Sequence, residues 1–196
     1  MSTSTPYSFK QMFPMKYATI WRRVWAFVLD FLILSPVIIL TYYLKHHVHN
    51  SFFVAGAIIL TPSVASVYGI WMHSRGGQTF GMMGTKIRLV DQYETSTPSL
   101  RQAFLLQIVS IVFSICFVGL ALHAIALHTY LPTSFAKNST NRLVTNLDLC
   151  WILADIICIF CNRKHRSLHD LIAGTVVLRD RDYMLQLELR RQQELG

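Results

Sequence analysis

Four long apolar runs limit what this chain of 196 residues can fold into. They cover residues 21–44, 51–72, 100–131 and 143–161. A helix needs about 20 mostly apolar residues to cross the hydrocarbon core of a bilayer. Charged residues make up only 14% of the chain, whereas an average soluble domain has about 25%. We therefore predict an all-α membrane protein with four transmembrane helices, surrounded by the lipid bilayer.

Internal features of these runs refine that expectation. Pro62 predicts a kink in the second helix. The third run is longer than a bilayer requires, so its helix must tilt or begin in the cytosol. The fourth run is the weakest, because it contains Asp148 and Asp155. No compact apolar signal core precedes the first run, so we expect that run to be a retained membrane helix.

Lysine and arginine residues are distributed unevenly over the four-span arrangement. If both termini lie in the cytosol, fifteen of these residues are cytosolic, and only Lys45, Lys137 and Arg142 lie on the other side. Cytosolic loops of membrane proteins carry such an excess. The pattern therefore predicts cytosolic termini and an even number of spans. The net charge of +8 has the same origin, so we expect no nucleic-acid partner.

Two segments predicted to be cytosolic, residues 77–91 and 167–180, resemble each other. Each has a short apolar stretch of helical character, a Gly-Thr pair, a β-branched run and an Asp. The Gly-Thr pairs are residues 84–85 and 174–175, and glycine suits the C-terminal end of a helix. The runs that follow suit short strands. We therefore expect two small cytosolic helix-strand elements, for which an internal repeat is one open explanation.

The chain divides into three parts by composition. Residues 1–16 form a cytosolic N-terminal segment, residues 17–180 the transmembrane domain, and residues 181–196 a polar cytosolic tail. The tail is helix-prone but lacks a clean apolar stripe, so we expect a surface helix or a frayed end rather than a coiled coil.

The first apolar run contains an arginine and an aspartate that share one helix face. Arg23 and Asp30 are seven residues apart, which is two turns and about 10.5 Å along the axis. An ionised carboxylate inside a membrane is costly, so Asp30 should face protein or water and have a partner. Two interpretations stay open: a polar clamp that fixes helix packing, and a functional ion or proton site.

Polar side chains on the other predicted helices lie at a depth similar to that of Asp30. They are Ser66, Gln107 and Asp155, each about seven residues from the predicted inner end of its helix. If they face one another, the two carboxylates would readily share a proton, because like charges raise each other's pKa. The alternative is a chance alignment of depths, since the direction of each side chain is unknown.

Two groups of residues have some resemblance to metal sites. Cys158, Cys161, His165 and His169 have zinc-like spacing, but on one continuous helix they span about 16 Å, too far for one tetrahedral ion. The second group consists of His46, His47, His49, His123 and His128. These histidines are more readily explained as solvated loop residues. We therefore expect no metal site, and no disulfide, because the four cysteines all lie in apolar runs.

Near the C-terminal end, Ser167 and Asp170 have the S-x-x-D spacing of a capping box. We expect Asp170 to cap a short cytosolic helix or to reach a basic partner beneath the bundle. No nucleophile elbow, Walker loop, dinucleotide fingerprint or HExxH motif is present. We therefore expect neither an enzyme nor a bound cofactor.

Three of these motifs together resemble the RDD family of small bacterial membrane proteins, named for an arginine, an aspartate in the first helix and a later aspartate. WRRVWAFVLD matches the R-x-x-A-x-x-x-D core as Arg23, Ala26 and Asp30. GQTFGMMGTKIRLVD, followed by PSLRQAF, resembles the central cytosolic segment of the family. RSLHDLIAGTVVL resembles its closing motif, with Asp170 as the second aspartate. The resemblance covers most of residues 17–180.

The chain departs from the family pattern at two places. Met82 and Met83 stand where members usually have basic residues, and Asp148 and Asp155 are not part of the signature. The resemblance implies a multi-spanning protein of the bacterial inner membrane. It also implies transport as the suggested activity, with cation/proton exchange proposed for some members.

Two functions follow as expectations. The first is transport, with Asp30 as the titrating or cation-binding group and Arg23 as its electrostatic gate. Further candidate site residues are Asp155, Gln107 and Asp170. Because four helices are few for a transport pathway, this function requires a homo-oligomer. The second function is a non-catalytic scaffold that assembles with another membrane protein and whose buried charges fix helix register.

Overall fold

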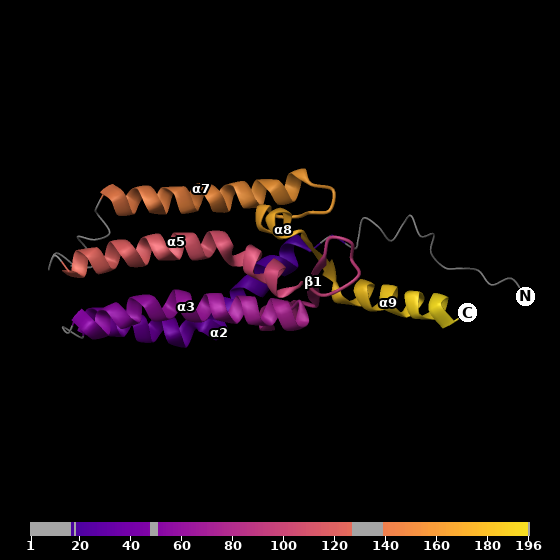
Figure 1. The fold of residues 1–196 in the computed structure, drawn as a ribbon, viewed down its shortest axis with the longest axis horizontal. Coiled ribbons are helices and arrows are strands. Elements are labelled where there is room, and N and C mark those ends of the chain that lie inside the picture. The colour runs from indigo at the N-terminus through magenta and orange to yellow at the C-terminus, as the bar shows by residue number, and fades with distance from the viewer. Residues whose placement is uncertain (1–16, 18, 48–50, 127–138, 196) are drawn as a thin grey trace, which may run out of the picture.

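Four long helices form the body of the protein and lie side by side (Figure 1). The computed structural model describes residues 17–195, apart from residues 18, 48–50 and 127–138. The long helices are α2 (Ile20–His47), α3 (Ser51–Gly76), α5 (Leu100–Ala126) and α7 (Ser139–Cys161). Each of them is long and apolar enough to cross a membrane. The prediction of an all-α membrane protein with four spanning helices is therefore confirmed.

The helix boundaries differ from the predicted runs by a few residues. α5 ends at Ala126, whereas the apolar run continues to residue 131, and residues 127–138 lie outside the described part of the chain. α7 begins at Ser139, because the polar residues before Leu143 continue the helix. The predicted N-terminal segment, residues 1–16, also lies outside the described residues.

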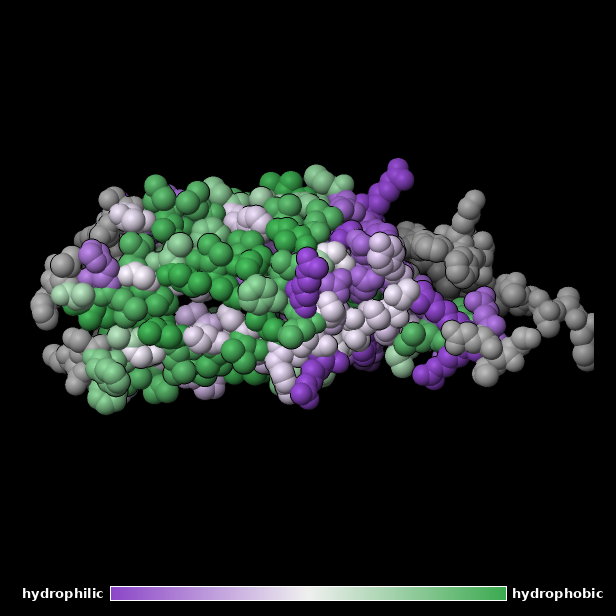
Figure 2. All heavy atoms as spheres, in the orientation of Figure 1, coloured by the Kyte–Doolittle hydropathy of each residue, from purple (hydrophilic) through white to green (hydrophobic). Residues whose placement is uncertain are grey.

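The long helices pack mainly as neighbours in a row. α3 packs against both α2 and α5, and α5 packs against α7. Many large apolar side chains on these helices are exposed, and Figure 2 shows them as an apolar surface over the body of the molecule. Hydrophilic side chains gather at the end where the β-strands lie. We call this end the sheet end and the opposite end the far end.

Two prolines lie inside long helices, and each removes one backbone hydrogen bond. Pro36 cannot donate to the carbonyl of Leu32, and the Ser35 hydroxyl donates to that carbonyl instead, at 2.7 Å. α3 continues through Pro62, which stands four residues after Ile58. The carbonyl of Ile58 therefore lacks the donor that a regular helix supplies.

A short helix followed by a strand occurs twice, in the two segments where the sequence predicts it. The elements are α4 (Phe80–Thr85), β1 (Ile87–Asp91), α8 (Leu168–Ala173) and β2 (Thr175–Arg179). The strands pair antiparallel, with Ile87 opposite Arg179 and Asp91 opposite Thr175. Two segments that are far apart in the chain thus form one two-stranded sheet.

The two helix-strand units align differently from the Gly-Thr match in the sequence. Gly174 ends α8 in the left-handed conformation, with a φ of 65°, and Lys86 ends α4 in the same conformation, with a φ of 56°. Thr85 is still part of α4. The predicted equivalence of the two Gly-Thr pairs is therefore wrong by two residues.

This alignment predicts opposite effects on stability for substitutions at the C-terminal caps of α4 and α8. Lys86→Gly should raise the free energy of unfolding by up to about 1 kcal/mol, because a side chain in the left-handed conformation is strained and glycine is not. Gly174→Ala should lower the free energy of unfolding by about 1 kcal/mol for the same reason. Denaturant titration in detergent micelles, followed by tryptophan fluorescence, measures both. Effects of the same sign at the two positions would contradict the alignment.

The sheet contains the most deeply buried large side chains in the described chain. One face belongs to a cluster of Ala26, Ile87, Leu89, Leu106, Ala173 and Val177. The opposite face belongs to a cluster of Tyr17, Val90, Val176, Leu178 and Tyr183. Because both faces are covered, the uninterrupted apolar run of β2 suits its position. The sheet thus joins the helix bundle to α9 (Asp180–Leu195), the helical tail that projects away from the bundle (Figure 1).

Candidate functional site

The carboxylate of Asp30 on α2 lies at the start of α4 and accepts three hydrogen bonds. Its Oδ1 accepts from the Tyr68 hydroxyl at 2.7 Å and from the backbone N–H of Gly81 at 2.8 Å. Its Oδ2 accepts from the Thr79 hydroxyl at 2.6 Å. Donors from α3 and from the beginning of α4 therefore converge on one carboxylate.

α4 is held along α2 at both of its ends. Asp30 binds the N-terminal end, where the helix dipole favours a negative group, and Arg22 Nη1 donates to the Thr85 carbonyl at the C-terminal end, at 2.7 Å. Arg22, Ala26 and Asp30 share one face of α2 because they follow at four-residue spacing. A Cβ atom at Gly81 would lie 2.1 Å from the Ala26 carbonyl oxygen. The close approach of α4 to α2 therefore requires glycine at this position.

The hydroxyl groups that bind Asp30 also accept hydrogen bonds. The N–H of Phe80 donates to the Tyr68 hydroxyl oxygen at 3.0 Å. The N–H of Met82 donates to the Thr79 hydroxyl oxygen at 3.2 Å, which makes Thr79 the N-terminal cap of α4. Each hydroxyl therefore gives its hydrogen to the carboxylate and receives one from the helix, so Asp30 is tied into the first turn of α4.

Arg23 connects α2 to the second helix-strand unit. Its Nη1 lies 2.7 Å from Oδ2 of Asp170, and its Nη2 donates to the His165 carbonyl at 3.1 Å. The side chains of Arg23 and Asp170 are 16% and 4% exposed. Asp170 also forms the capping box with Ser167, in which each side chain accepts from the backbone N–H of the other. Asp170 thus has both contacts that the sequence suggested, a helix cap and a basic partner.

The pairing of Arg23 with Asp170 corrects one idea from the sequence. Arg23 and Asp30 lie on one face of α2 but bind different partners, so the partner that Asp30 was expected to need is not Arg23. Arg23 attaches α8, and Asp30 attaches α4. One helix face, two turns long, thereby anchors both helix-strand units.

Asp155 has a partner of its own. Its Oδ1 accepts from Nδ1 of His169 at 2.8 Å and from the backbone N–H of His169 at 3.2 Å. The other ring nitrogen, Nε2, accepts from the indole N–H of Trp151 at 3.1 Å. These bonds attach α7 to α8, whereas Asp30 faces α3 and α4. Asp155 and Asp30 therefore do not share one site, and of the two alternatives left open for these two carboxylates the structure favours a chance similarity of depth.

Gln107 packs against α3 close to the Asp30 site. A Cβ atom at Gly69 would lie 2.5 Å from the amide nitrogen of Gln107, so the glycine makes room for this side chain. Gly69 directly follows Tyr68, which donates to Asp30. Ser66 is partly buried on α3.

His73 belongs to the same polar region. The residue is 8% exposed, and its ring lies within electrostatic range of Asp30 and Asp170. The ring interacts with the Gly69 carbonyl one turn earlier, but its Nδ1 makes no hydrogen bond of normal geometry within the described residues. A buried imidazole thus accompanies the two signature aspartates.

A further polar cluster lies beside the sheet. The hydroxyl of Tyr17 donates to the Glu94 carboxylate, and Nζ of Lys164 lies 3.8 Å from Oε1 of Glu94. Burial and, to a smaller extent, the neighbouring carboxylate raise the pKa of Tyr17. The phenol therefore stays protonated at physiological pH and holds the start of the described chain to the loop after β1.

No group of three or more metal-binding side chains occurs among residues 17–195 outside the undescribed gaps. His169 bonds with Asp155 and Trp151, and Nδ1 of His165 lies 3.0 Å from the Ile159 carbonyl. In the other histidine group, His49 and His128 lie outside the described residues. The structure therefore describes only part of this histidine group. Within it, Nδ1 of His46 lies 3.1 Å from the Tyr42 carbonyl.

Several contact residues were missed in the sequence. Thr79 carries a usable signal, because a threonine directly before an apolar helical stretch is a typical N-terminal cap. Gly81 and Arg22 carry only weak signals, since glycine is common in loops and Arg22 is one of many basic residues. Tyr68 lies in a long apolar run and carries none.

The comparisons with known proteins agree with the motifs at this site. No curated protein and no solved structure gives a significant match. The model of the RDD family matches residues 17–174, a range that includes Arg23, Asp30 and Asp170. All three of these residues take part in attaching α4 and α8 to α2. The chain is a multi-pass membrane protein and belongs to the RDD family.

Proposed function

We propose that this protein transports protons or small monovalent cations across the membrane, with Asp30 as the group that binds them. The observation that carries this proposal is the neutrality of the donors around Asp30. Tyr68, Thr79 and Gly81 bring no charge, and Asp30 makes no ion pair within the described part of the chain. The negative charge is left for a proton or a mobile cation to neutralise.

The cost of burying this charge supports the proposal. Asp30 lies ten residues, or about 15 Å, from the start of α2 and inside the membrane-capable stretch Ile20–Leu44. An ionised aspartate at the centre of a membrane helix costs about 2.5–3.5 kcal/mol on insertion scales. Hydrogen bonds from neutral donors lower that cost but leave the charge in place. Neutralisation by a bound cation is therefore favourable.

We assign different roles to the other predicted site residues. Arg23 is balanced by Asp170, so its charge does not occupy the carboxylate of Asp30. Gln107 packs one residue from Tyr68 along α3 and remains a candidate for the cation path. Asp155 is bound to His169, and we assign it a role in attaching α7 to α8.

We place the sheet end in the cytosol of a bacterial inner membrane, with both termini on that side. The support is the excess of lysine and arginine that this orientation assigns to the cytosol. We further propose a homo-oligomer, because four helices packed in a row are few for an enclosed pathway. The proposed activity is movement of an ion and involves no enzymatic conversion.

A second function, a non-catalytic membrane scaffold, is favoured by the Arg23–Asp170 pair. The pair is buried and fixes α8 against α2, and buried charges can set the register of packed elements in this way. In this alternative, Asp30 is a clamp for α4 and no ion flux accompanies it.

A flux assay on proteoliposomes separates the two functions. The wild-type chain is reconstituted with a pH-sensitive dye inside, and proton movement is recorded on imposing gradients of Na⁺ or K⁺. Asp30→Asn should abolish the flux, because asparagine keeps an acceptor oxygen and the side-chain shape but cannot bind or release the proton. Asp182→Asn on α9 is the control, since it removes an acidic residue outside the membrane-capable helices.

Thermal unfolding of each variant shows whether loss of flux reflects loss of folding. Asp30→Glu adds a second measurement, because it keeps the charge and should retain part of the flux. A wild-type chain without flux, or an Asp30→Asn variant with wild-type flux, overturns the transport proposal.

A further inference from the structure

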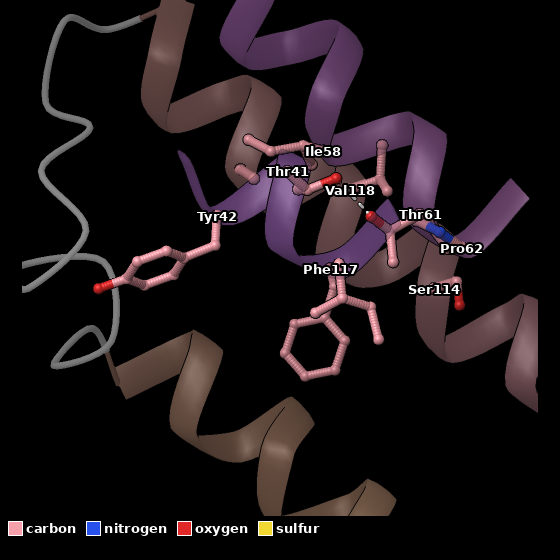
Figure 3. A pocket seen from close by; sticks show the side chains of 10 residues that line it. Thr41, Tyr42, Ile58, Thr61, Pro62, Ser114, Phe117 and Val118 are labelled. Atoms are coloured by element: carbon pink, nitrogen blue, oxygen red, sulfur yellow. Dashed lines mark hydrogen bonds between the residues drawn. The ribbon is translucent and has the colours of Figure 1, made fainter. Parts of the chain in front are cut away.

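A cavity of about 490 Å³ lies between α2, α3 and α5, on the far-end side of the Asp30 site. Its lining is mostly apolar, and Figure 3 shows Thr41, Thr61 and Ser114 around it. None of the described residues that line the cavity is charged. Its size is in the range of small-molecule sites, about 300–1,000 Å³.

One wall of the cavity offers oxygen atoms. The hydroxyls of Thr41 and Thr61 lie 2.7 Å apart and bridge α2 to α3. Ile58 and Pro62 also line the cavity, and Pro62 deprives the Ile58 carbonyl of its helical donor. In a membrane helix, a freed carbonyl is normally satisfied by a neighbouring group or by water. The two hydroxyls thus give this mostly apolar lining hydrogen-bonding groups for water.

The polar residues of the cavity lie on the same helix faces as the residues of the Asp30 site. On α3, Thr61 is seven residues from Tyr68, and on α5, Ser114 is seven residues from Gln107. A separation of seven residues is two turns, or about 10.5 Å.

On α2, too, the polar residue of the cavity is separated from the Asp30 site by a whole number of helical turns. On α2, Thr41 is eleven residues from Asp30, which is three turns or about 16.5 Å. Three helices thus each carry one polar group in the cavity and another in or beside the Asp30 site, along one face.

We infer that this cavity is a water-filled entry chamber through which a proton or a small monovalent cation, with its hydration water, reaches Asp30 from the far end. Hydroxyl and carbonyl oxygens can replace water around such a cation, and the uncharged walls offer no fixed charge that would hold it. This inference rests on the proposed transport function. It assigns to Thr41, Thr61 and Ser114 a role that the family motifs do not contain.

Cysteine accessibility tests the chamber independently of transport. Ser114→Cys is introduced into a chain whose four natural cysteines are replaced by alanine. Intact cells are treated with a membrane-impermeant, charged methanethiosulfonate. The matched control is Ile115→Cys, the next residue of α5, which is 65% exposed and is not one of the residues that line the cavity. Only a thiol in contact with water forms the reactive thiolate.

We expect labelling of Ser114→Cys and no labelling of Ile115→Cys. Absence of labelling at both positions, or equal labelling at both, overturns the inference, because the cavity is then dry or not distinct from the lipid face. The proton-flux assay on the same variant tests the role in transport. The unlabelled Ser114→Cys variant should be active, and labelling should block its flux.

The outcomes separate this inference from the function on which it rests. Labelling that leaves the flux unchanged overturns the entry role alone. A wild-type chain without flux for protons, Na⁺ or K⁺ overturns the proposed function and the entry role together, whatever the labelling shows. Labelling of Ser114→Cys together with a block of flux supports both.

Discussion

Asp170→Asn is expected to lower the free energy of unfolding by about 3 kcal/mol, because the substitution leaves the guanidinium of Arg23, which is only 16% exposed, without its counter-charge. Asparagine has nearly the shape of aspartate, so the loss reports the charge rather than a cavity. Denaturant titration in mixed micelles, followed by the fluorescence of the tryptophans, measures this change.

The matched control for this prediction is a more exposed ion pair at the same end of the molecule. Lys164 and Glu94 are 3.8 Å apart, and the Lys164 side chain is 45% exposed. Lys164→Met should therefore cost only about 0–1 kcal/mol. If Asp170→Asn costs no more than Lys164→Met, the Arg23–Asp170 pair does not anchor α8.

A double-mutant cycle isolates the pair itself. Arg23→Gln alone should also be strongly destabilising, since it leaves the carboxylate of Asp170 buried without a cation. The double variant should lose less stability than the sum of the two single variants, because neither charge then remains alone. Additive losses would show that the two side chains act separately.

The second large effect is expected for Gly81→Ala, which should lower the free energy of unfolding by about 3 kcal/mol or more. The new Cβ atom would lie 2.1 Å from the Ala26 carbonyl oxygen and 2.8 Å from the carboxylate of Asp30. Overpacking of this kind typically costs about 1–3 kcal/mol. Loss of the hydrogen bond from the Gly81 N–H to a charged group adds about 1.5–3 kcal/mol. α4 must therefore move away from α2.

A glycine in an open part of the chain provides the comparison. Gly56 lies inside α3, and a Cβ atom there would meet nothing within 4 Å. Gly56→Ala should therefore stabilise the helix by about 0.5–1 kcal/mol. The same titration measures both variants, and a Gly81→Ala variant as stable as wild type would mean that α4 is not held this close to α2.

These two substitutions also help to interpret the flux experiments. Asp170 and Gly81 support the arrangement around α2, whereas Asp30 is the proposed binding group. If the role of Asp30 is only structural, the Asp30→Asn variant should lose stability and flux together, as expected for Gly81→Ala. A binding role makes Asp30→Asn lose flux while it stays folded. Stability and flux measured on the same preparations therefore separate an anchor from a site.

The sequence by itself determined the four spanning helices and the two helix-strand segments. Long apolar runs admit few structures other than membrane helices, because every backbone polar group must be satisfied within the segment. The short segments were also predictable, because a cap residue, an apolar turn and a β-branched run are local signals. The family was recognisable from Arg23, Asp30 and Asp170, since these residues lie in ordered local motifs.

The exact ends of α4 depended on more than the local signals. Gly84 looks like the residue that ends this helix, but Lys86 does so, and the helix continues through Thr85. Arg22 on α2 donates to the Thr85 carbonyl, and Asp30 accepts from the N–H of Gly81 at the other end. A contact with another helix thus supports the last turn that glycine seemed to end.

Only the tertiary structure decided which side chains meet. Arg23 and Asp170 are 147 positions apart in the chain, and Asp30 and Gly81 are 51 apart. Asp30 and Asp155 have similar predicted depths, yet one faces α4 and the other faces α8. The sequence shows how deep a residue lies along its helix. The partner depends on the rotation of that helix about its axis and on how the two helix-strand units pair, and both follow from packing between distant segments.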